Sequence, residues 1–253
     1  MPQLEAGKFD GSEVMWHTQE RAQFLLFSKP YLENRLVLLT RNDKSPLASE
    51  LSELKGKRLG LVKGYAYGPE IWQAKGPVIV DGSSDEDNLR RLLKGEIDYT
   101  LVDELLVYYL FNYDSAKATR LLRAGAKPIV TRPLHFVLRK DVPGAAEIML
   151  RFDEMIPQMI ADGSYHRILH LEWLVADVDG DGRNEAVLLG SQAGVAPPTT
   201  EYRVFGPKMQ GTPRFMVNGE VYDDWSRVPD RYKVERERID SFRPGVNIVL
   251  FEF

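Results

Sequence analysis

Four acidic residues lie close together in the stretch DVDGDGRNEAVLLG, from Asp177 to Gly190. Calcium prefers six to eight oxygen ligands, and carboxylates at every second position can converge on one ion where glycines allow a sharp turn. A fourth carboxylate and one backbone carbonyl follow at suitable positions. The sequence therefore predicts a structural calcium site made by Asp177, Asp179, Asp181, Arg183 through its carbonyl, and Glu185.

The spacing of this loop differs from that of an EF-hand. An EF-hand places a bidentate Glu at position 12 of the loop, where this chain has Leu188 inside an apolar run. The loop instead resembles the calcium hairpins of FG-GAP-type β repeats. The alternative is an acidic turn without an ion, although three aspartates so close together repel one another.

Other signatures of chemistry do not occur in the sequence. The four histidines form no recognised metal motif, and there is no Ser-His-Asp order, phosphate-binding glycine loop or HExxH. Because the chain has no cysteine, disulfides, thiol nucleophiles and thiolate metal sites are excluded. The sequence therefore gives no motif for these kinds of catalytic or metal site.

The charge and hydropathy of the chain narrow the classes of partner that the protein is expected to bind. The 253 residues include 33 Lys and Arg against 37 Asp and Glu, for a net charge of -4, which gives no broad basic field for nucleic acid or an anionic membrane. No apolar run approaches the roughly 20 residues of a membrane-spanning helix. The first residues, MPQLEAGKFDG, carry no export signal.

Short apolar strands alternate with amphipathic helices between Glu13 and Ala145, which predicts an α/β domain with a largely parallel sheet. The expected strands are Val14 to Trp16, Arg35 to Thr40, Arg58 to Val62, Val78 to Val80, Tyr99 to Val102 and His135 to Arg139. The expected helices are Pro69 to Ala74, Asp85 to Lys94, with Ser84 as N-cap and Gly95 as stop, and Glu104 to Tyr113.

The pattern then changes twice. A longer helix is expected from Gly144 to about His170, with a break at Asp162-Gly163. After Trp173, strands separated by Gly, Pro and Asp predict a small β-rich segment with a hairpin turn at Asn218-Gly219.

Three motifs together resemble one protein family. HTQERAQFLLFSKPYLENRLVLLTR, LSELKGKRLGLVKGYAYGPE and NLRRLLKGEIDYTLVDELLVYYL are similar, in order and spacing, to bacterial extracellular solute-binding proteins of family 3, across about residues 2–171. The resemblance implies a periplasmic-binding-protein-like fold: two α/β lobes joined by crossing strands, here Leu36 to Arg41 and His135 to Lys140. Residues 1–36 and 141–172 would form a partial lobe 1, 37–140 lobe 2, and 173–253 the β-rich segment.

The resemblance also implies a ligand site. Arg21 matches the arginine that binds the ligand carboxylate, Thr18 the hydroxyl residue before it, and Asp103 the acid that receives the ammonium. A guanidinium opposite a carboxylate is what an amino acid requires chemically. Taken singly, Arg21 could be a solvated charge and Asp103 a cap for the helix at Glu104.

Three rings depart from the family pattern. Trp16, Tyr65 and Tyr67 stand where small or hydroxyl residues are common. They could stack on an aromatic or cationic ligand, or they could fill a gap in the packing.

The function implied by the resemblance is that of a periplasmic solute-binding protein, not an enzyme, which delivers an amino-acid-like molecule to an ABC permease by hinge closure. One alternative is an enzyme of dehydratase or cell-wall lytic type on the same scaffold, with Asp103, Glu104 or His17 as acid or base. Another is a sensor or interaction module that has lost ligand binding.

The resembled family has a further strand-helix-strand-helix portion before the arginine turn. The resemblance therefore predicts an N-terminally truncated first lobe, with an apolar surface covered by the β segment or by self-association with another copy.

Overall fold

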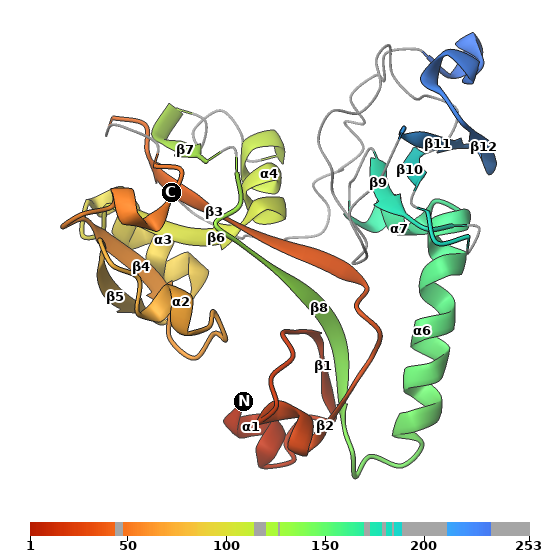
Figure 1. Cartoon of the computed structure of the whole chain (residues 1–253). Helices are drawn as coiled ribbons and strands as arrows, with labels where there is room; N and C mark the ends of the chain where they lie inside the picture. The colour runs from red at the N-terminus through yellow and green to blue at the C-terminus, as the bar shows by residue number, and fades with distance from the viewer. Residues whose placement is uncertain are drawn as a thin grey trace. The chain divides into compact units, whose positions relative to one another are not determined.

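The computed structural model describes residues 1–43, 48–113, 120–125, 127–169, 173–178, 181–183, 185–188 and 212–233. The chain forms two compact units. Among the described residues, unit 1 comprises Met1–Glu33 and those from Pro133 onward, and unit 2 comprises those within Asn34–Arg132. The chain passes between the units within two long strands, β3 (Leu32–Arg41) and β8 (Val130–Arg139), drawn in Figure 1. The division into lobes and β segment given above stays a prediction.

Unit 2 is built on a mixed sheet in the order β3-β6-β4-β5, with β7 pairing along β3. The further strands are β4 (Arg58–Val62), β5 (Val78–Gly82), β6 (Tyr99–Asp103) and β7 (Leu122–Ala124). Strand β4 runs parallel to both β5 and β6, whereas β3 is antiparallel to β6. The carboxyl ends of β4, β5 and β6 therefore meet at one edge, where ligands usually bind in open α/β sheets.

The helices of unit 2 start where local signals place them. Ser84 accepts a hydrogen bond at 3.1 Å from the Asp87 amide and caps α3 (Asp85–Lys94), which ends at Gly95 with φ of 76°. A short helix α2 (Pro69–Trp72) follows β4, α4 (Glu104–Tyr113) follows β6, and Leu51–Glu53 form a 3₁₀ turn. The core joins α3 and α4 to the sheet through Val37, Leu39, Leu89, Leu92, Ile97, Val102, Val107, Leu110 and Leu122.

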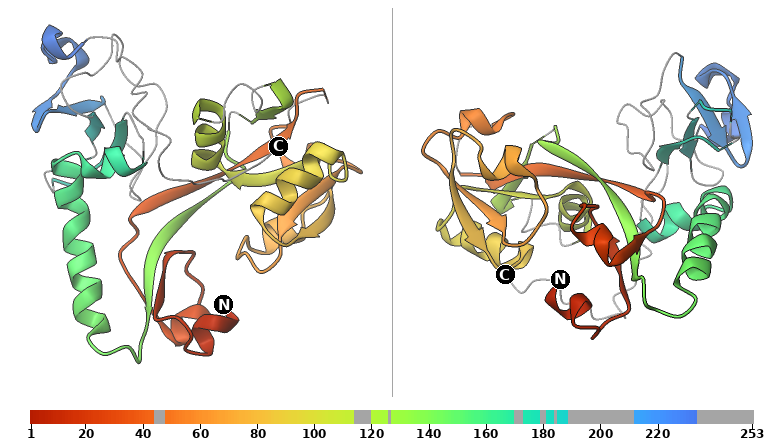
Figure 2. Two further views of the ribbon diagram at one scale, coloured as in Figure 1. Left: turned by 180° about the vertical axis from the view of Figure 1, so that it is seen from behind. Right: turned by 60° about the horizontal axis from the view of Figure 1, so that its bottom comes forward.

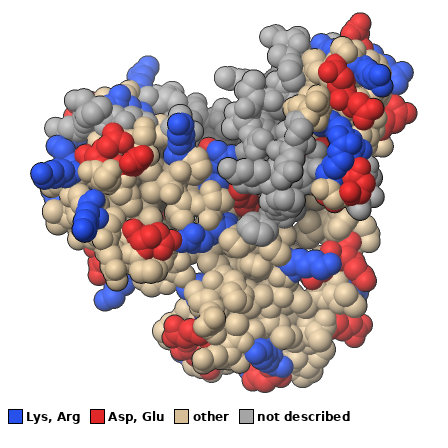
Figure 3. All heavy atoms as spheres, in the orientation of Figure 1, with Lys and Arg blue, Asp and Glu red and all other residues tan. Residues whose placement is uncertain are grey.

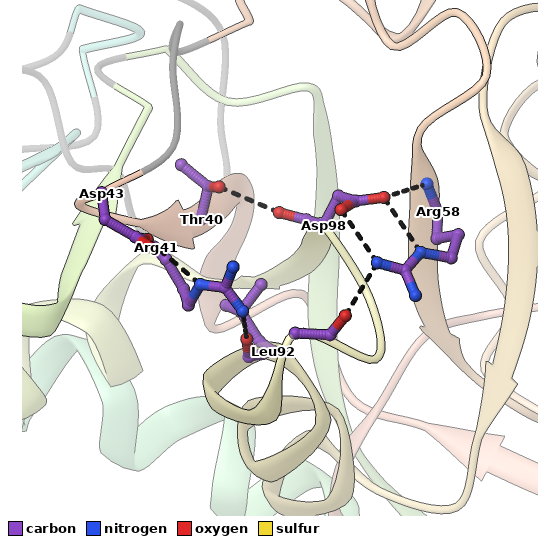
Figure 4. A network of polar contacts seen from close by, with 7 residues as sticks. Thr40, Arg41, Asp43, Arg58, Leu92 and Asp98 are labelled. Carbon is purple, nitrogen blue, oxygen red and sulfur yellow. Dashed lines mark hydrogen bonds and ion pairs between the residues drawn. The ribbon is translucent and has the colours of Figure 1, made fainter.

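A polar network fixes the entry into β6 (Figure 4). Arg58 holds both oxygens of Asp98, with Nη2 at 3.1 Å from Oδ1 and Nε at 3.1 Å from Oδ2, and its Nη2 also donates to the Gly95 carbonyl at 2.8 Å. Thr40 Oγ1 donates to the Asp98 carbonyl at 2.9 Å. Strands β3, β4 and β6 are thus tied together at the end opposite the carboxyl edge.

Unit 1 begins with α1 (Pro2–Glu5) and is organised along β8. Strands β1 (Gly11–Met15) and β2 (Leu25–Phe27) both pair antiparallel with β8, and a 3₁₀ turn, Arg21–Gln23, connects them. The long helix α6 (Ala145–Ala161) stands beside β8 in both views of Figure 2. It ends at the predicted break, because Asp162 caps it and Gly163 has φ of 77° before α7 (Ser164–Leu169).

The β-rich segment of unit 1 is a four-stranded sheet in the order β12-β11-β10-β9. Its strands are β9 (Trp173–Ala176), β10 (Glu185–Leu188), β11 (Arg214–Val217) and β12 (Glu220–Tyr222), followed by 3₁₀ turns at Trp225–Arg227 and Asp230–Tyr232. The hairpin turn is confirmed, because β11 and β12 pair antiparallel around Asn218 and Gly219, which have φ of 54° and 82°. His166 of α7 joins this sheet to the helices, with Nε2 at 3.0 Å from the Val187 carbonyl oxygen.

Candidate ligand-binding site

The turn of unit 1 that contains Arg21 is fixed by hydrogen bonds to residues just before it in the chain. Arg21 begins the 3₁₀ turn, and its amide donates to Thr18 Oγ1 at 3.2 Å. Its guanidinium Nη1 donates to the Trp16 carbonyl at 2.9 Å. Burial lowers the pKa of Arg21, against the raising effect of Glu20. The structure thus brings together the three site residues predicted in this unit, and the Trp16 side chain is buried.

Two histidines and a phenylalanine lie beside this turn. The Phe27 ring makes edge contacts with His17 and His135, at centroid distances of 4.7 and 5.6 Å. His135 is buried, and its Nδ1 lies 2.8 Å from the Ser28 carbonyl oxygen. Burial lowers the pKa of His135, which favours the neutral ring with Nδ1 as donor. The sequence did not identify this cluster, because Phe27 of β2, His135 of β8 and His17, which follows β1, are brought together only when the strands pair.

Asp103 ends β6 at the carboxyl edge of the unit 2 sheet. Its Oδ1 accepts hydrogen bonds from the amides of Leu105 at 2.6 Å and Leu106 at 3.4 Å, and Oδ2 accepts one from the Asn34 side chain. Asp103 therefore does cap α4. Burial nevertheless raises the pKa of Asp103 to about 6, while the two amides lower it and the charges of Asp85 and Glu104 raise it further.

The two tyrosines after β4 have different surroundings. Tyr67 is 1% exposed, and its hydroxyl accepts a hydrogen bond from the Val62 amide at 3.2 Å. Tyr65 is 42% exposed, with its ring 5.7 Å from that of Tyr67 and its hydroxyl donating to Asp85 Oδ2 at 3.0 Å. Packing thus uses Tyr67 in the core and leaves the Tyr65 ring at the surface. Their contact with a ligand stays a prediction.

The structure places two further polar residues at this edge of the sheet. Asp85 begins α3 at the same edge as Asp103, and burial raises its pKa while the Tyr65 hydroxyl lowers it. Asn34 supplies the side-chain donor to Asp103. A sequence signal for Asp85 did exist, because it follows the end of a third parallel strand. Asn34 gave none. Glu104, considered above as a general acid or base, pairs with Arg35 at 2.9 Å.

The structure describes part of the acidic loop, residues 177–185, of the β segment. Arg214 Nη1 lies 2.8 Å from Asp181 Oδ2 and 2.9 Å from Glu185 Oε1, and Glu185 is fully buried. Asp177 Oδ2 accepts from the Gly182 amide at 3.0 Å. Asp179 lies outside the described residues. Among the residues that are described, no group of three or more acidic or histidine side chains is gathered for a metal ion, and a guanidinium faces two of the predicted ligands.

The surface charge is mixed. Figure 3 shows basic and acidic side chains interspersed over the described part of this face, without a continuous basic field. Among the helices in the described ranges, none is long and apolar enough to cross a membrane.

Sequence comparison relates the chain to known proteins. The chain is 28% identical over 185 residues to the histidine-binding periplasmic protein of Escherichia coli strain K12, a match that covers 66% of each protein. It is 26% identical over 184 residues to the lysine/arginine/ornithine-binding periplasmic protein of the same strain, again over 66% of each. The chain thus spans just under two thirds of the length of these curated relatives.

Comparison with solved structures identifies proteins with a similar fold. An arginine transport system periplasmic binding protein from Legionella pneumophila superposes with a TM-score of 0.55 at 23% identity, over 67% of this chain and 74% of the other. The periplasmic VFT2 domain of BvgS from Bordetella pertussis gives 0.52 at 21% identity, over 67% and 69%. These matches confirm the periplasmic-binding-protein-like α/β fold. Residues 1–175 match the profile of one family, so the chain belongs to the bacterial extracellular solute-binding proteins, family 3.

Proposed function

We propose that this protein is a periplasmic solute-binding protein that holds an amino-acid-like molecule by hinge closure and delivers it to an ABC permease, without covalent chemistry. Arg21 of unit 1 binds the ligand carboxylate, assisted by Thr18, and Asp103 of unit 2 binds the ammonium. The observation that carries the proposal is Asp103, a partly buried carboxylate at the carboxyl end of β6 in a member of this family.

The chemistry of both residues supports this role. The Arg21 guanidinium is oriented by its hydrogen bond to Trp16, so less side-chain entropy is lost when it binds a carboxylate. Asp103 is held in one orientation by Asn34 and two amides. The relatives named for histidine, lysine, arginine and ornithine bind molecules that carry both an α-carboxylate and an α-ammonium.

The test is calorimetry of the purified chain against a panel of the common amino acids. We expect at least one to bind, and Arg21→Ala to weaken that binding by about 2–5 kcal/mol because a desolvated charge pair is lost. Arg151→Gln is the matched control, since it removes an exposed arginine of α6 in the same unit. Unchanged affinity in the Arg21 variant contradicts the assignment, and binding of no amino acid contradicts the function.

A further inference from the structure

We propose that Asp85 is a specificity-determining residue of the ligand site, and that it selects an amino acid with a cationic side chain. The inference rests on the proposed function, because it assigns a role within the same site. It is carried by the position of Asp85 and Tyr65 beside Asp103, entirely within unit 2.

Three parallel strands place these residues together. Tyr65 follows β4, Asp85 follows β5 and Asp103 ends β6. The start of α3 is drawn close to this edge because Gly82 has no Cβ, which would collide with the Asn88 side chain of the helix. The Tyr65 hydroxyl then reaches Asp85 Oδ2 at 3.0 Å.

The two carboxylates interact electrostatically. Burial is the main reason why the pKa of Asp103 and that of Tyr65 are raised; the charge of Asp85 raises both further, and the charge of Asp103 also raises that of Tyr65. Within the described part of unit 2, no Lys or Arg forms an ion pair with either carboxylate. Two partly buried negative charges near each other are unfavourable until cations balance them. The ligand ammonium balances Asp103, so a second ligand cation balances Asp85.

Asp85 differs in its contacts from the other acids in the first turn of α3. Ser84 already caps α3, and the other two acids of the first turn interact locally: Glu86 with Arg90 and Asp87 with the Ser83 amide. Of the three acids, Asp85 is the one that Tyr65 orients. The exposed Tyr65 ring adds an aromatic face, which attracts guanidinium and ammonium groups.

Arginine and citrulline provide the test, because they have nearly the same shape but differ in side-chain charge. Calorimetry of the full chain is expected to show arginine binding at least about tenfold more tightly than citrulline. In Asp85→Asn this ratio is expected to fall to about twofold or less, through weaker arginine binding. Glu86→Gln, which removes a charge from the same helical turn, is expected to keep the original ratio.

The outcomes separate this inference from the proposed function. A ratio near one in the unmodified chain overturns the role of Asp85 without any variant. An unchanged arginine-to-citrulline ratio in Asp85→Asn also overturns this role. Tight binding of neutral amino acids alone overturns the role of Asp85 as well, but it agrees with the proposed function. Binding of no amino acid overturns both.

Discussion

The Asp103 carboxyl group is subject to opposing influences on its pKa. As the cap of α4 it accepts two amide hydrogen bonds, which favour the carboxylate. Its burial and the charges of Asp85 and Glu104 favour the protonated form, and they prevail, because the pKa rises to about 6. The bound ammonium of a ligand would shift this balance back towards the carboxylate.

Ligand binding is therefore expected to depend on pH. Because only the carboxylate holds an ammonium, affinity should rise as pH increases through about 6, and binding at pH 5 should be about tenfold weaker than at pH 7.5. Binding near pH 6 should also release protons. Calorimetry in two buffers of different ionisation enthalpy measures both effects.

Asp103→Asn supplies the comparison for that experiment. Its affinity should be lower at pH 7.5 and nearly constant over the same pH range, because the titrating group is gone. Asp81→Asn, at an exposed position of β5, should behave as the unmodified chain. A pH profile of Asp103→Asn that matches the unmodified chain would assign the titration to another group.

The Arg58–Asp98 pair makes a prediction about stability. Hydrogen bonds from Arg58 lower the pKa of Asp98, so its stabilising effect is present above the unfolded value of 3.8 and is lost as pH falls through the folded value. Asp98→Asn should lower the melting temperature by a few degrees at pH 7, and the difference from the unmodified chain should shrink in acid. Thermal melts at pH 7 and pH 3 measure this, and a constant difference would assign the effect to neutral hydrogen bonds.

The acidic loop and β11 make a second prediction. Calcium that binds only the folded form raises the melting temperature by mass action, and we expect this rise in excess calcium relative to chelator. Arg214 faces two of the predicted ligands, so Arg214→Gln should melt earlier in chelator and gain more from calcium, since a competing cation is removed. Equal melting temperatures with calcium and chelator in both proteins would show that the loop is a turn without an ion.

Local signals predicted the elements better than the contacts between them. The caps of α3, the break after α6 and the turn at Asn218 and Gly219 were all read correctly, because each depends on neighbouring residues. Strand β2, three residues long, was missed since it gains its stability from pairing with β8. The sequence also left open which tyrosine is buried, and it gave Asp85 only as the start of a helix. The burial of each tyrosine and the contact of Asp85 with Tyr65 depend on segments about 20 residues apart, which meet only when the sheet has folded.

At the scale of the whole molecule, hinge closure would be observed as a change in compactness. If the ligand is bound by Arg21 and Asp103 together, binding is expected to make the protein more compact, because the residues belong to different units. Small-angle scattering should show a smaller radius of gyration with ligand in the unmodified chain but not in Asp103→Asn at the same ligand concentration. An unchanged radius at saturating ligand would argue against closure.

The course of the chain also bears on how the protein is made. The sheet and helices of unit 2 come from one continuous stretch, Asn34–Arg132, whereas unit 1 needs segments from both sides of it. During synthesis every strand of the unit 2 sheet leaves the ribosome before Pro133, but β1 and β2 must wait for β8 before they can pair. Because domains generally fold as units while the chain emerges, unit 2 is expected to form first, and the segment before it stays exposed to chaperones and proteases until translation passes β8.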